Sequence, residues 1–327
     1  MKRFLLLTVL AFFGCTLFAQ PADSLVAWER GYRHFSYVYE PLADKPIEVY
    51  YYIPRKGDVT QMRVLFAMHG ADRSGSTALK CWLEFAEQHG FVVIAPEFSR
   101  DFFNENAYQF GNVYETKEFK VLNPRDKWVY SSIESIFDYF IVCNKSAAEF
   151  YDMYGHSAGG QFTHRYVIAL CPERLNIAVA ANPGTWTFPL VDGLVGESGH
   201  VYGWPYSIYN TPFDSKEHIE AIFAKKLYIQ TGTMDTATSG EHVPTDEAAL
   251  AEGKNRHDRA IRFHKCAQSE ALSLGINLNW NLVKANGIGH QGKGMVYGIF
   301  DLQDGRRVYD TSFYTTTGAY YLIFEAK

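Results

Sequence analysis

Apolar residues recur along this chain in two alternating patterns. Short, mainly apolar runs predict strands over 63–68, 91–95, 150–154, 175–181, 226–231 and 279–283. Segments with apolar residues at every third or fourth position predict helices over 77–89, 128–142, 160–170 and 257–274. Because the two kinds of segment alternate, we expect an α/β fold, with a mainly parallel sheet and helices on both faces.

The remaining segments depart from this alternation. Segments 33–41 and 47–54, joined by a Pro/Asp turn, predict two strands that pair as an antiparallel edge. The excursion 182–218 is rich in Gly, Pro and aromatic residues, and segment 298–327 is expected to add a final strand or an edge segment. Since no repeat, low-complexity tract or Ser/Pro linker divides the chain, we expect one domain over 20–327.

The N-terminus has the layout of an export signal. Basic residues, an apolar run over 4–13 and the small residue Ala19 are typical of a signal peptide, which we place at 1–19. Lipid attachment at Cys15 is an alternative, although an aliphatic residue is expected where Phe12 stands. The apolar run is short for a membrane span. We therefore expect the mature chain to be periplasmic or secreted, without a membrane span.

Composition narrows the range of partners. The 327 residues include 31 basic and 36 acidic side chains, a net charge of −5, with no run of either sign. Nothing in this pattern indicates a nucleic acid or an anionic membrane surface as partner. The cysteines beyond Cys15 lie in or beside apolar helical segments, which favours buried free thiols over disulfides; they are Cys81, Cys143, Cys171 and Cys266. None has the spacing of metal ligands, and the sequence implies no metal or organic cofactor.

One short stretch carries the candidate chemistry. Residues 154–160 contain Gly155-x-Ser157-x-Gly159, the pattern of a nucleophile elbow. A predicted strand precedes it and a predicted helix follows it, which is the setting that the motif requires. Side chains at the two glycines would collide with the neighbouring strand and helix, so we expect a strained turn that exposes the Ser157 hydroxyl.

A serine hydroxyl is a weak nucleophile until a base takes its proton and a third group orients that base. On a parallel sheet, functional groups gather beyond the carboxyl ends of the strands. Asp235 follows the predicted strand 226–231, and His290 follows the predicted strand 279–283. This order fits a triad in which His290 is the general base of Ser157 and Asp235 orients it.

Other residues compete for these roles. Asp246 and Asp214 are the rival acids. His156 lies inside the elbow and is expected to pack under the turn. His164 and His264 lie on predicted helices and are expected to be structural.

Acyl transfer also requires hydrogen-bond donors for the oxyanion. The backbone N–H of Ala158, directly after the nucleophile, is one candidate. The second is the N–H of Ala71 in the turn after the strand 63–68, where Gly70 permits close approach of the backbone. The alternative is that this turn is merely a tight strand exit.

The excursion 182–218 is the candidate wall of an acyl or alcohol pocket. Aromatic side chains within it either line that pocket or pack the excursion onto the sheet, and the candidates are Trp186, Trp204 and Tyr206.

Together these elements resemble the α/β-hydrolases. His69-Gly70, Gly155-His156-Ser157-Ala158-Gly159, Asp235 and Gly289-His290 are similar to secreted esterases of the polyhydroxybutyrate-depolymerase and feruloyl-esterase kind, over residues of about 45 to 295. Met is common in those esterases where Ala158 stands. The resemblance implies a secreted serine hydrolase that cleaves carboxylic esters, small or polymer-linked, through an acyl-enzyme.

Two functions of other classes stay open at this point. A peptidase of the prolyl-oligopeptidase type shares the triad, but such enzymes usually carry an added propeller, and no repeat precedes residue 45. A non-catalytic binding protein on a hydrolase fold is the other, and the intact Ser/Asp/His set argues against it.

Overall fold

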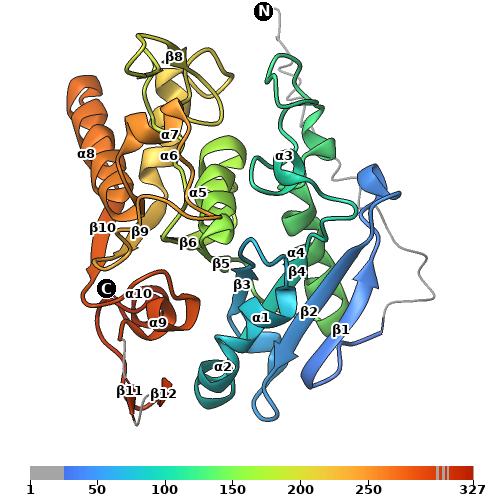
Figure 1. Ribbon diagram of the computed structural model, residues 1–327. Coiled ribbons are helices and arrows are strands. Elements are labelled where there is room, and N and C mark those ends of the chain that lie inside the picture. Colours follow the sequence, from blue (N-terminus) through green and yellow to red (C-terminus); the bar gives the residue numbers. More distant parts are fainter. Residues whose placement is uncertain (1–25, 300–301, 304–305, 308, 327) are drawn as a thin grey trace, which may run out of the picture.

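The computed structural model describes residues 26–299, 302–303, 306–307 and 309–326. Within them, eight strands form a central sheet in the order β1-β2-β4-β3-β5-β6-β9-β10 (Figure 1). These strands are β1 (Gly31–Tyr37), β2 (Ile47–Ile53), β3 (Val64–Met68), β4 (Val92–Glu97), β5 (Tyr151–His156), β6 (Leu175–Ala181), β9 (Lys226–Gly232) and β10 (Trp280–Ala285). The sheet is parallel from β4 to β10, and β2 pairs antiparallel with both β1 and β4. The predicted α/β class and antiparallel edge are therefore confirmed.

Alternation of side chains along each strand divides the core into two layers. In β3, Val64, Phe66 and Met68 point into one layer and Leu65 and Ala67 into the other, and all five are buried. A strand buried on both faces needs apolar residues at every position, which is why β3 is a continuous apolar run.

Helices cover both faces of this sheet (Figure 1). The first core layer holds buried side chains of α4 (Ser131–Asn144), α5 (Ala158–Leu170), α6 (Lys216–Ala224) and α8 (Arg256–Leu274). The second holds those of α1 (Gly75–Lys80), α2 (Leu83–His89), α9 (Gly292–Tyr297) and α10 (Ala319–Phe324). The predicted helix over 77–89 is thus two helices, which separate at Cys81 and the buried Trp82.

The excursion after β6 packs its buried aromatic and aliphatic side chains into the first core layer. It contains the two-stranded hairpin of β7 (Leu194–Val195) and β8 (Val201–Tyr202). Glu247, in α7 (Glu247–Glu252), accepts hydrogen bonds from Ser198 N–H at 2.7 Å and Tyr202 Oη at 3.0 Å. The excursion is therefore fastened to the segment that follows β9, at the carboxyl end of the sheet.

The prediction of a strand or edge segment at the C-terminus is wrong. The segment instead forms the short hairpin of β11 (Leu302–Gln303) and β12 (Arg306–Arg307), apart from the central sheet, and ends in the six-residue helix α10. Tyr320 stacks on Phe85 with ring centroids 4.1 Å apart, and Phe324 stacks on Phe91 at 4.3 Å. Tyr320 and Phe324 are four residues apart, so a helix places both rings on the same face, one turn from each other.

Smaller elements complete the chain. They are α3 (Glu105–Tyr108) and the 3₁₀ turns η2 (Glu40–Leu42), η3 (Val59–Gln61) and η4 (Arg125–Lys127). The four described cysteines are free thiols, as predicted, but only Cys143 among them is buried, and the other three are partly exposed. In the described part of the chain, no helix combines the length and the apolar character needed to cross a membrane. Residues 1–19, the predicted signal peptide, lie outside the described residues.

Candidate active site

Ser157 lies at the junction of β5 and α5 in a backbone conformation that few residues adopt. Its φ is +58° and its ψ is −119°, outside the regions that side-chain-bearing residues prefer. The glycines on either side make this turn possible. A Cβ on Gly155 would lie 2.1 Å from the Gly159 carbonyl oxygen, and one on Gly159 would lie 2.3 Å from the Met68 carbonyl oxygen. The elbow therefore has the strain and close packing that its sequence predicts.

The structure brings Ser157, His290 and Asp235 together. Ser157 Oγ lies 3.0 Å from His290 Nε2, and His290 Nδ1 lies 2.7 Å from Asp235 Oδ2. Both distances are within hydrogen-bonding range, although the three residues are far apart in sequence. With the proton on Nδ1, the imidazole donates to the carboxylate and leaves Nε2 free to accept the serine proton.

Backbone contacts between two loops hold His290 near Asp235. The N–H of Met234 donates to the Ile288 carbonyl at 2.9 Å, and the N–H of Thr233 donates to the Ala285 carbonyl at 3.0 Å. A Cβ on Gly232 would lie only 2.3 Å from the Ile288 carbonyl oxygen, so glycine is required where the loops cross. The loops after β9 and β10 consequently act as one unit.

Asp235 is buried and has a second ionic partner. Its side chain is 1% exposed, and Oδ1 lies 3.3 Å from Nη1 of Arg256, whose side chain is 4% exposed. The N–H of His257 donates to the Asp235 backbone carbonyl at 3.3 Å. The first turn of α8 therefore contacts both the side chain and the backbone of this aspartate.

The turn after β3 lies directly beside the nucleophile. A Cβ on Gly70 would lie 4.0 Å from Ser157 Cβ. The turn is closed by a hydrogen bond from Arg73 N–H to the Gly70 carbonyl at 3.1 Å. Ala71 lies within it, and Ala158 is the first residue of α5, so both predicted oxyanion donors belong to segments that flank Ser157.

His69 fastens this turn to the neighbouring strand exit. Its Nδ1–H donates to the Gly70 carbonyl at 3.0 Å, and its Nε2 accepts from Phe98 N–H at 3.0 Å. Its ring stacks on Tyr108 with centroids 4.2 Å apart, and Tyr108 Oη donates to the His69 carbonyl at 2.6 Å. Burial lowers the pKa of His69 to about 3, so the ring is neutral and keeps one donor and one acceptor.

The competing residues occupy other positions. Asp246 caps α7 by accepting from Ala249 N–H, and it also accepts from Tyr206 Oη at 3.0 Å. His156 packs its ring 4.6 Å from the ring of His290. His164 lies between the Gly160 carbonyl and the Thr187 N–H within the core, and His264 contacts the Trp280 carbonyl. Asp214 lies before α6.

The predicted pocket aromatics differ in exposure. Trp186 is fully buried and stacks on Phe263 with centroids 4.4 Å apart, and Trp204 is 6% exposed beside Phe213. Both positions fit the interpretation that these rings pack the excursion onto the sheet. Tyr206 is partly exposed and joins the excursion to α7 through Asp246.

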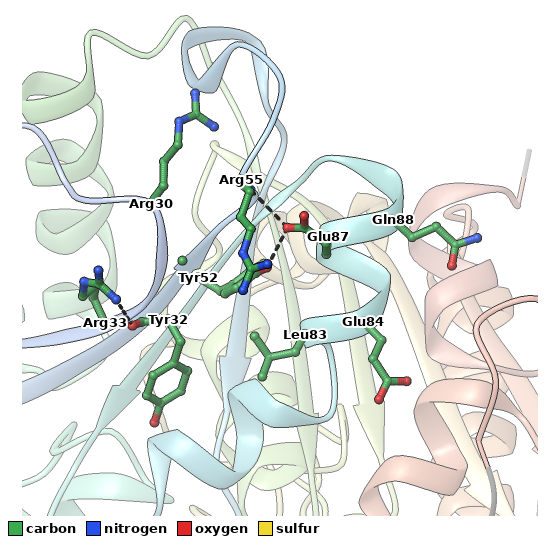
Figure 2. A pocket seen from close by; sticks show the side chains of 10 residues that line it. Arg30, Tyr32, Arg33, Tyr52, Arg55, Leu83, Glu84, Glu87 and Gln88 are labelled. Carbon is green, nitrogen blue, oxygen red and sulfur yellow. Dashed lines mark hydrogen bonds between the residues drawn. The ribbon is translucent and has the colours of Figure 1, made fainter.

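A hollow of about 1010 Å³ lies away from these residues, and Figure 2 shows its lining. Arg30, Tyr32, Arg55 and Glu87 are among the side chains around it. Tyr52, also in the lining, pairs with Val93 near the start of β4, whereas Ser157 follows the carboxyl end of β5. The hollow is therefore at the opposite end of the sheet from the candidate active site. Within the described residues, no group of His, Cys, Asp and Glu has the arrangement of a metal site.

Two residues at the site were missed by the sequence analysis. Arg256 contacts Asp235, and its position at the start of a helix gave no sign of that contact. Asn182 directly follows β6, so the rule that functional groups follow parallel strands could have found it. Its side chain accepts from Gly232 N–H at 2.8 Å and donates to the Gly289 carbonyl at 3.3 Å.

Comparison with known proteins agrees with this architecture. The chain is similar to the structure of poly(aspartic acid) hydrolase-1 from Sphingomonas sp. KT-1, with a TM-score of 0.74 and 30% identity over 82% of this chain and 96% of that one. It is also similar to LpqC, a poly(3-hydroxybutyrate) depolymerase from Bordetella parapertussis, with a TM-score of 0.73 and 26% identity over 81% of this chain and 86% of that one. An S-formylglutathione hydrolase from Agrobacterium tumefaciens shares the fold, with a TM-score of 0.52 and 14% identity over 81% of this chain and 91% of that one. No family model and no curated protein sequence matches the chain.

The sheet, the elbow and these neighbours define an α/β-hydrolase. The chain belongs to the esterase-like hydrolases of the α/β-hydrolase superfamily. It is an enzyme, a serine hydrolase of the carboxylic ester type. The resemblance and the class of enzyme predicted from the sequence are thereby confirmed.

Proposed function

We propose that the protein is an exported esterase that cleaves neutral carboxylic esters through a Ser157, His290 and Asp235 triad and an acyl-enzyme. One observation carries the proposal, the line of contacts from Ser157 Oγ through the His290 ring to Asp235 Oδ2, at 3.0 and 2.7 Å. The strained elbow, which exposes a hydroxyl between a strand and a helix, supports the same role for Ser157.

The first half-reaction forms the acyl-enzyme. His290 Nε2 takes the Ser157 hydroxyl proton as Oγ bonds to the ester carbonyl carbon, and the carbonyl oxygen becomes an oxyanion. The C–O bond to the leaving alcohol then breaks, and Nε2 returns the proton to that oxygen. Asp235 holds the imidazole in the required tautomer and stabilises its charged form.

The second half-reaction releases the acid. Water gives a proton to His290 Nε2 as its oxygen bonds to the acyl carbon, and the bond from that carbon to Ser157 Oγ breaks. The proton returns to Oγ, so the enzyme is restored and one water is consumed for each ester cleaved.

The oxyanion is stabilised by backbone amides in this proposal. The N–H of Ala158 and the N–H of Ala71 would donate to it from the two sides of Ser157. Such donors contribute most when they are held in place before the reaction. Rigidity of the Ala71 turn is supported by the His69 contacts and by Arg100, whose Nη2 donates to the Ala71 carbonyl at 2.5 Å.

Charge near the site favours a neutral substrate. A Cβ on Gly70 would lie 3.4 Å from Asp72 Oδ1, so an exposed carboxylate lies beside the oxyanion turn. Arg100, which is exposed, contacts the same turn, whereas Arg73 within the turn is buried and donates to the Phe98 and Phe103 carbonyls. The turn therefore presents one exposed charge of each sign and no basic track for a polyanion. With 36 acidic and 31 basic residues, the whole chain would also repel poly(aspartate). We therefore place the preferred substrates among neutral esters, including polyesters such as poly(3-hydroxybutyrate).

The test compares wild-type protein with Ser157→Ala on a panel of short and long nitrophenyl esters, feruloyl esters, poly(3-hydroxybutyrate), poly(aspartate) and an aminoacyl-nitroanilide. We expect turnover on neutral esters and labelling of the Ser157 peptide by a fluorophosphonate, both abolished by the substitution. Faster turnover of the nitroanilide would favour a peptidase of the prolyl-oligopeptidase type, and preference for poly(aspartate) would overturn the choice of neutral esters. A folded protein with neither labelling nor turnover would indicate a binding protein on a hydrolase fold.

Export is part of the same proposal. It rests on the basic, apolar and small-residue layout of residues 1–19. N-terminal sequencing of material from the periplasm or medium should find a chain that begins near Gln20. A lipid-modified Cys15 would place the protein on a membrane face, and an intact Met1 would reject export. We also propose that residues 20–327 are a single domain, since one sheet joins segments from β1 to β10.

A further inference from the structure

Arg256 is the buried cation next to the carboxylate of the proposed triad. Its Nη1 lies 3.3 Å from Asp235 Oδ1, while the other oxygen, Oδ2, faces His290 Nδ1 at 2.7 Å. Each oxygen of the carboxylate therefore has its own partner. A carboxylate with one partner can rotate about its Cβ–Cγ bond, whereas partners on both oxygens fix its plane.

Arg256 is itself held in a defined position. It is the first residue of α8, whose N-cap Asn255 accepts from Asp258 N–H at 2.9 Å. Its Nη2 donates to the backbone carbonyl of His242, so the guanidinium joins the long loop after β9 to Asp235. One turn along the same helix, the buried Arg259 donates to the carbonyls of Gly184 and Pro244, at 2.6 and 2.7 Å.

Because the Arg256–Asp235 pair is buried, each charge depends on the other for its stabilisation. The side chains of Arg256 and Asp235 are 4% and 1% exposed, so neither charge is solvated by bulk water. Removal of one partner leaves the other charge uncompensated, which the protein can relieve by turning the carboxylate toward another donor. Such a rotation of the carboxylate would move Asp235 Oδ2 away from His290 Nδ1, and the imidazole would lose its fixed orientation.

We propose that Arg256 is a positioning residue, which fixes the Asp235 carboxylate so that Oδ2 faces His290 Nδ1. This inference rests on the proposed triad. Arg256 acts through Asp235 and does not touch the reacting atoms, so its loss should lower kcat and leave KM unchanged. Since small misplacements of catalytic groups are costly, we expect kcat to fall by about 10- to 100-fold in Arg256→Ala.

The experiment is a double-mutant cycle of Arg256→Ala and Asp235→Asn, with kcat and KM measured on one activated ester. In the Asp235→Asn background, Arg256→Ala should change kcat by less than about twofold, because the carboxylate that it positions is already gone. Arg262→Ala is the matched control, since Arg262 is exposed two turns along the same helix. It should have the wild-type kcat.

Rescue separates positioning from a merely structural role. Free guanidinium at low millimolar concentration should restore part of kcat in Arg256→Ala, and methylammonium at the same concentration should restore less, since it lacks the planar fork of donors. If Arg256→Ala does not fold, Arg256→Lys makes the same test. It retains the charge, and it should lower kcat at constant KM in the wild-type background but not in Asp235→Asn.

The outcomes distinguish this inference from the proposed function. An equal fall in kcat on both backgrounds, a rise in KM alone, or a wild-type kcat in a folded Arg256→Ala or Arg256→Lys variant would overturn the positioning role. None of these results would touch the assignment of Ser157. A Ser157→Ala protein that retains turnover would overturn the proposed function itself.

Discussion

Asn182 Oδ1 accepts a hydrogen bond from the backbone N–H of Gly232 at 2.8 Å, which ties the exit of β6 to the exit of β9. The Asn182 Nδ2 group also reaches the Gly289 carbonyl at 3.3 Å, next to His290. Asn182 has a φ of +46°, a left-handed conformation that Asn tolerates better than most residues. One side chain thus joins three loops at the carboxyl end of the sheet.

Asn182→Ala should therefore reduce both stability and turnover. The substitution leaves the buried Gly232 N–H without its acceptor and keeps a left-handed φ that Ala disfavours, at a cost of about 1–3 kcal/mol in the free energy of unfolding. Looser loops at Gly232 and Gly289 should also lower kcat by about tenfold. Denaturant titration and ester turnover measure the two effects. A wild-type denaturation midpoint and kcat would show that the three loops are held by other contacts.

The elbow makes a sharper prediction at Gly159. A Cβ there would lie 2.3 Å from the Met68 carbonyl oxygen, and backbone cannot move aside as a flexible side chain can. We expect Gly159→Ala to cost more than about 4 kcal/mol or to prevent folding, and to abolish fluorophosphonate labelling. Gly289→Ala is the control, because its Cβ would lie no closer than 3.7 Å to the nearest atom, the Met234 carbonyl oxygen. It should fold like the wild type, and a folded, fully labelled Gly159→Ala would contradict the close packing.

Buried neutral histidines should make the protein sensitive to acid. Burial holds the pKa of His164 well below its usual value of 6.5 and lowers that of His69 to about 3. As the pH falls below 6.5, the unfolded chain binds protons at these positions and the folded chain does not, so stability is lost. Each such group contributes a slope of up to about 1.4 kcal/mol per pH unit.

The pH dependence can be assigned by substitution. His164→Gln should reduce the slope of unfolding free energy against pH between about pH 6.5 and pH 4.5, because Gln does not titrate there. Identical slopes for wild type and His164→Gln would show that this ring does not contribute.

The C-terminal helix should stabilise the domain without a part in catalysis. Tyr320 is 3% exposed, and its ring stacks on that of Phe85, a residue distant in sequence, with centroids 4.1 Å apart. Tyr320→Ala should lower the free energy of unfolding by about 3–5 kcal/mol, with kcat of the folded protein unchanged. Phe313→Ala, at a side chain that is 62% exposed, should change it by less than about 0.5 kcal/mol. Equal effects of the two substitutions would mean that α10 is not part of the folding unit.

Features that depend on residues close together in sequence could be predicted, and features that depend on distant contacts could not. The β3 run from Val64 to Met68 and the glycines around Ser157 carry their constraints in neighbouring residues, so strands and elbow were predicted from pattern alone. Segment 319–324 is a mixture of aromatic and aliphatic residues without a polar face. Its helix packs against Phe85 in α2 and Phe91 just before β4, which are distant in sequence. The proposed role of Arg256 could not be predicted either, since it depends on one contact with Asp235, which lies 21 positions earlier in the chain.

The assignment of Asp235 as the acid of the triad can be tested against the rival Asp246. Asp235 contacts His290, whereas Asp246 caps α7 and accepts from Tyr206 Oη at 3.0 Å. Asp235→Asn should therefore lower kcat by about 10⁴-fold, the loss expected when an imidazole is held in the wrong tautomer. Asp246→Asn should instead change stability by less than about 0.5 kcal/mol, because Asn caps a helix about as well as Asp, with kcat near the wild-type value.

The same comparison shows whether the three residues work as a unit. His290→Ala should cost about as much turnover as Ser157→Ala, and the double variant should be little worse than either, since the members of a triad are not additive. Turnover on one activated ester across these variants is the measurement, with thermal unfolding as the check that each is folded. If Asp246→Asn were the more damaging change and Asp235→Asn stayed near the wild type, the acid would be misassigned. The loop before α7 would then have to fold back over His290, and the 2.7 Å contact between His290 Nδ1 and Asp235 Oδ2 would have no part in turnover.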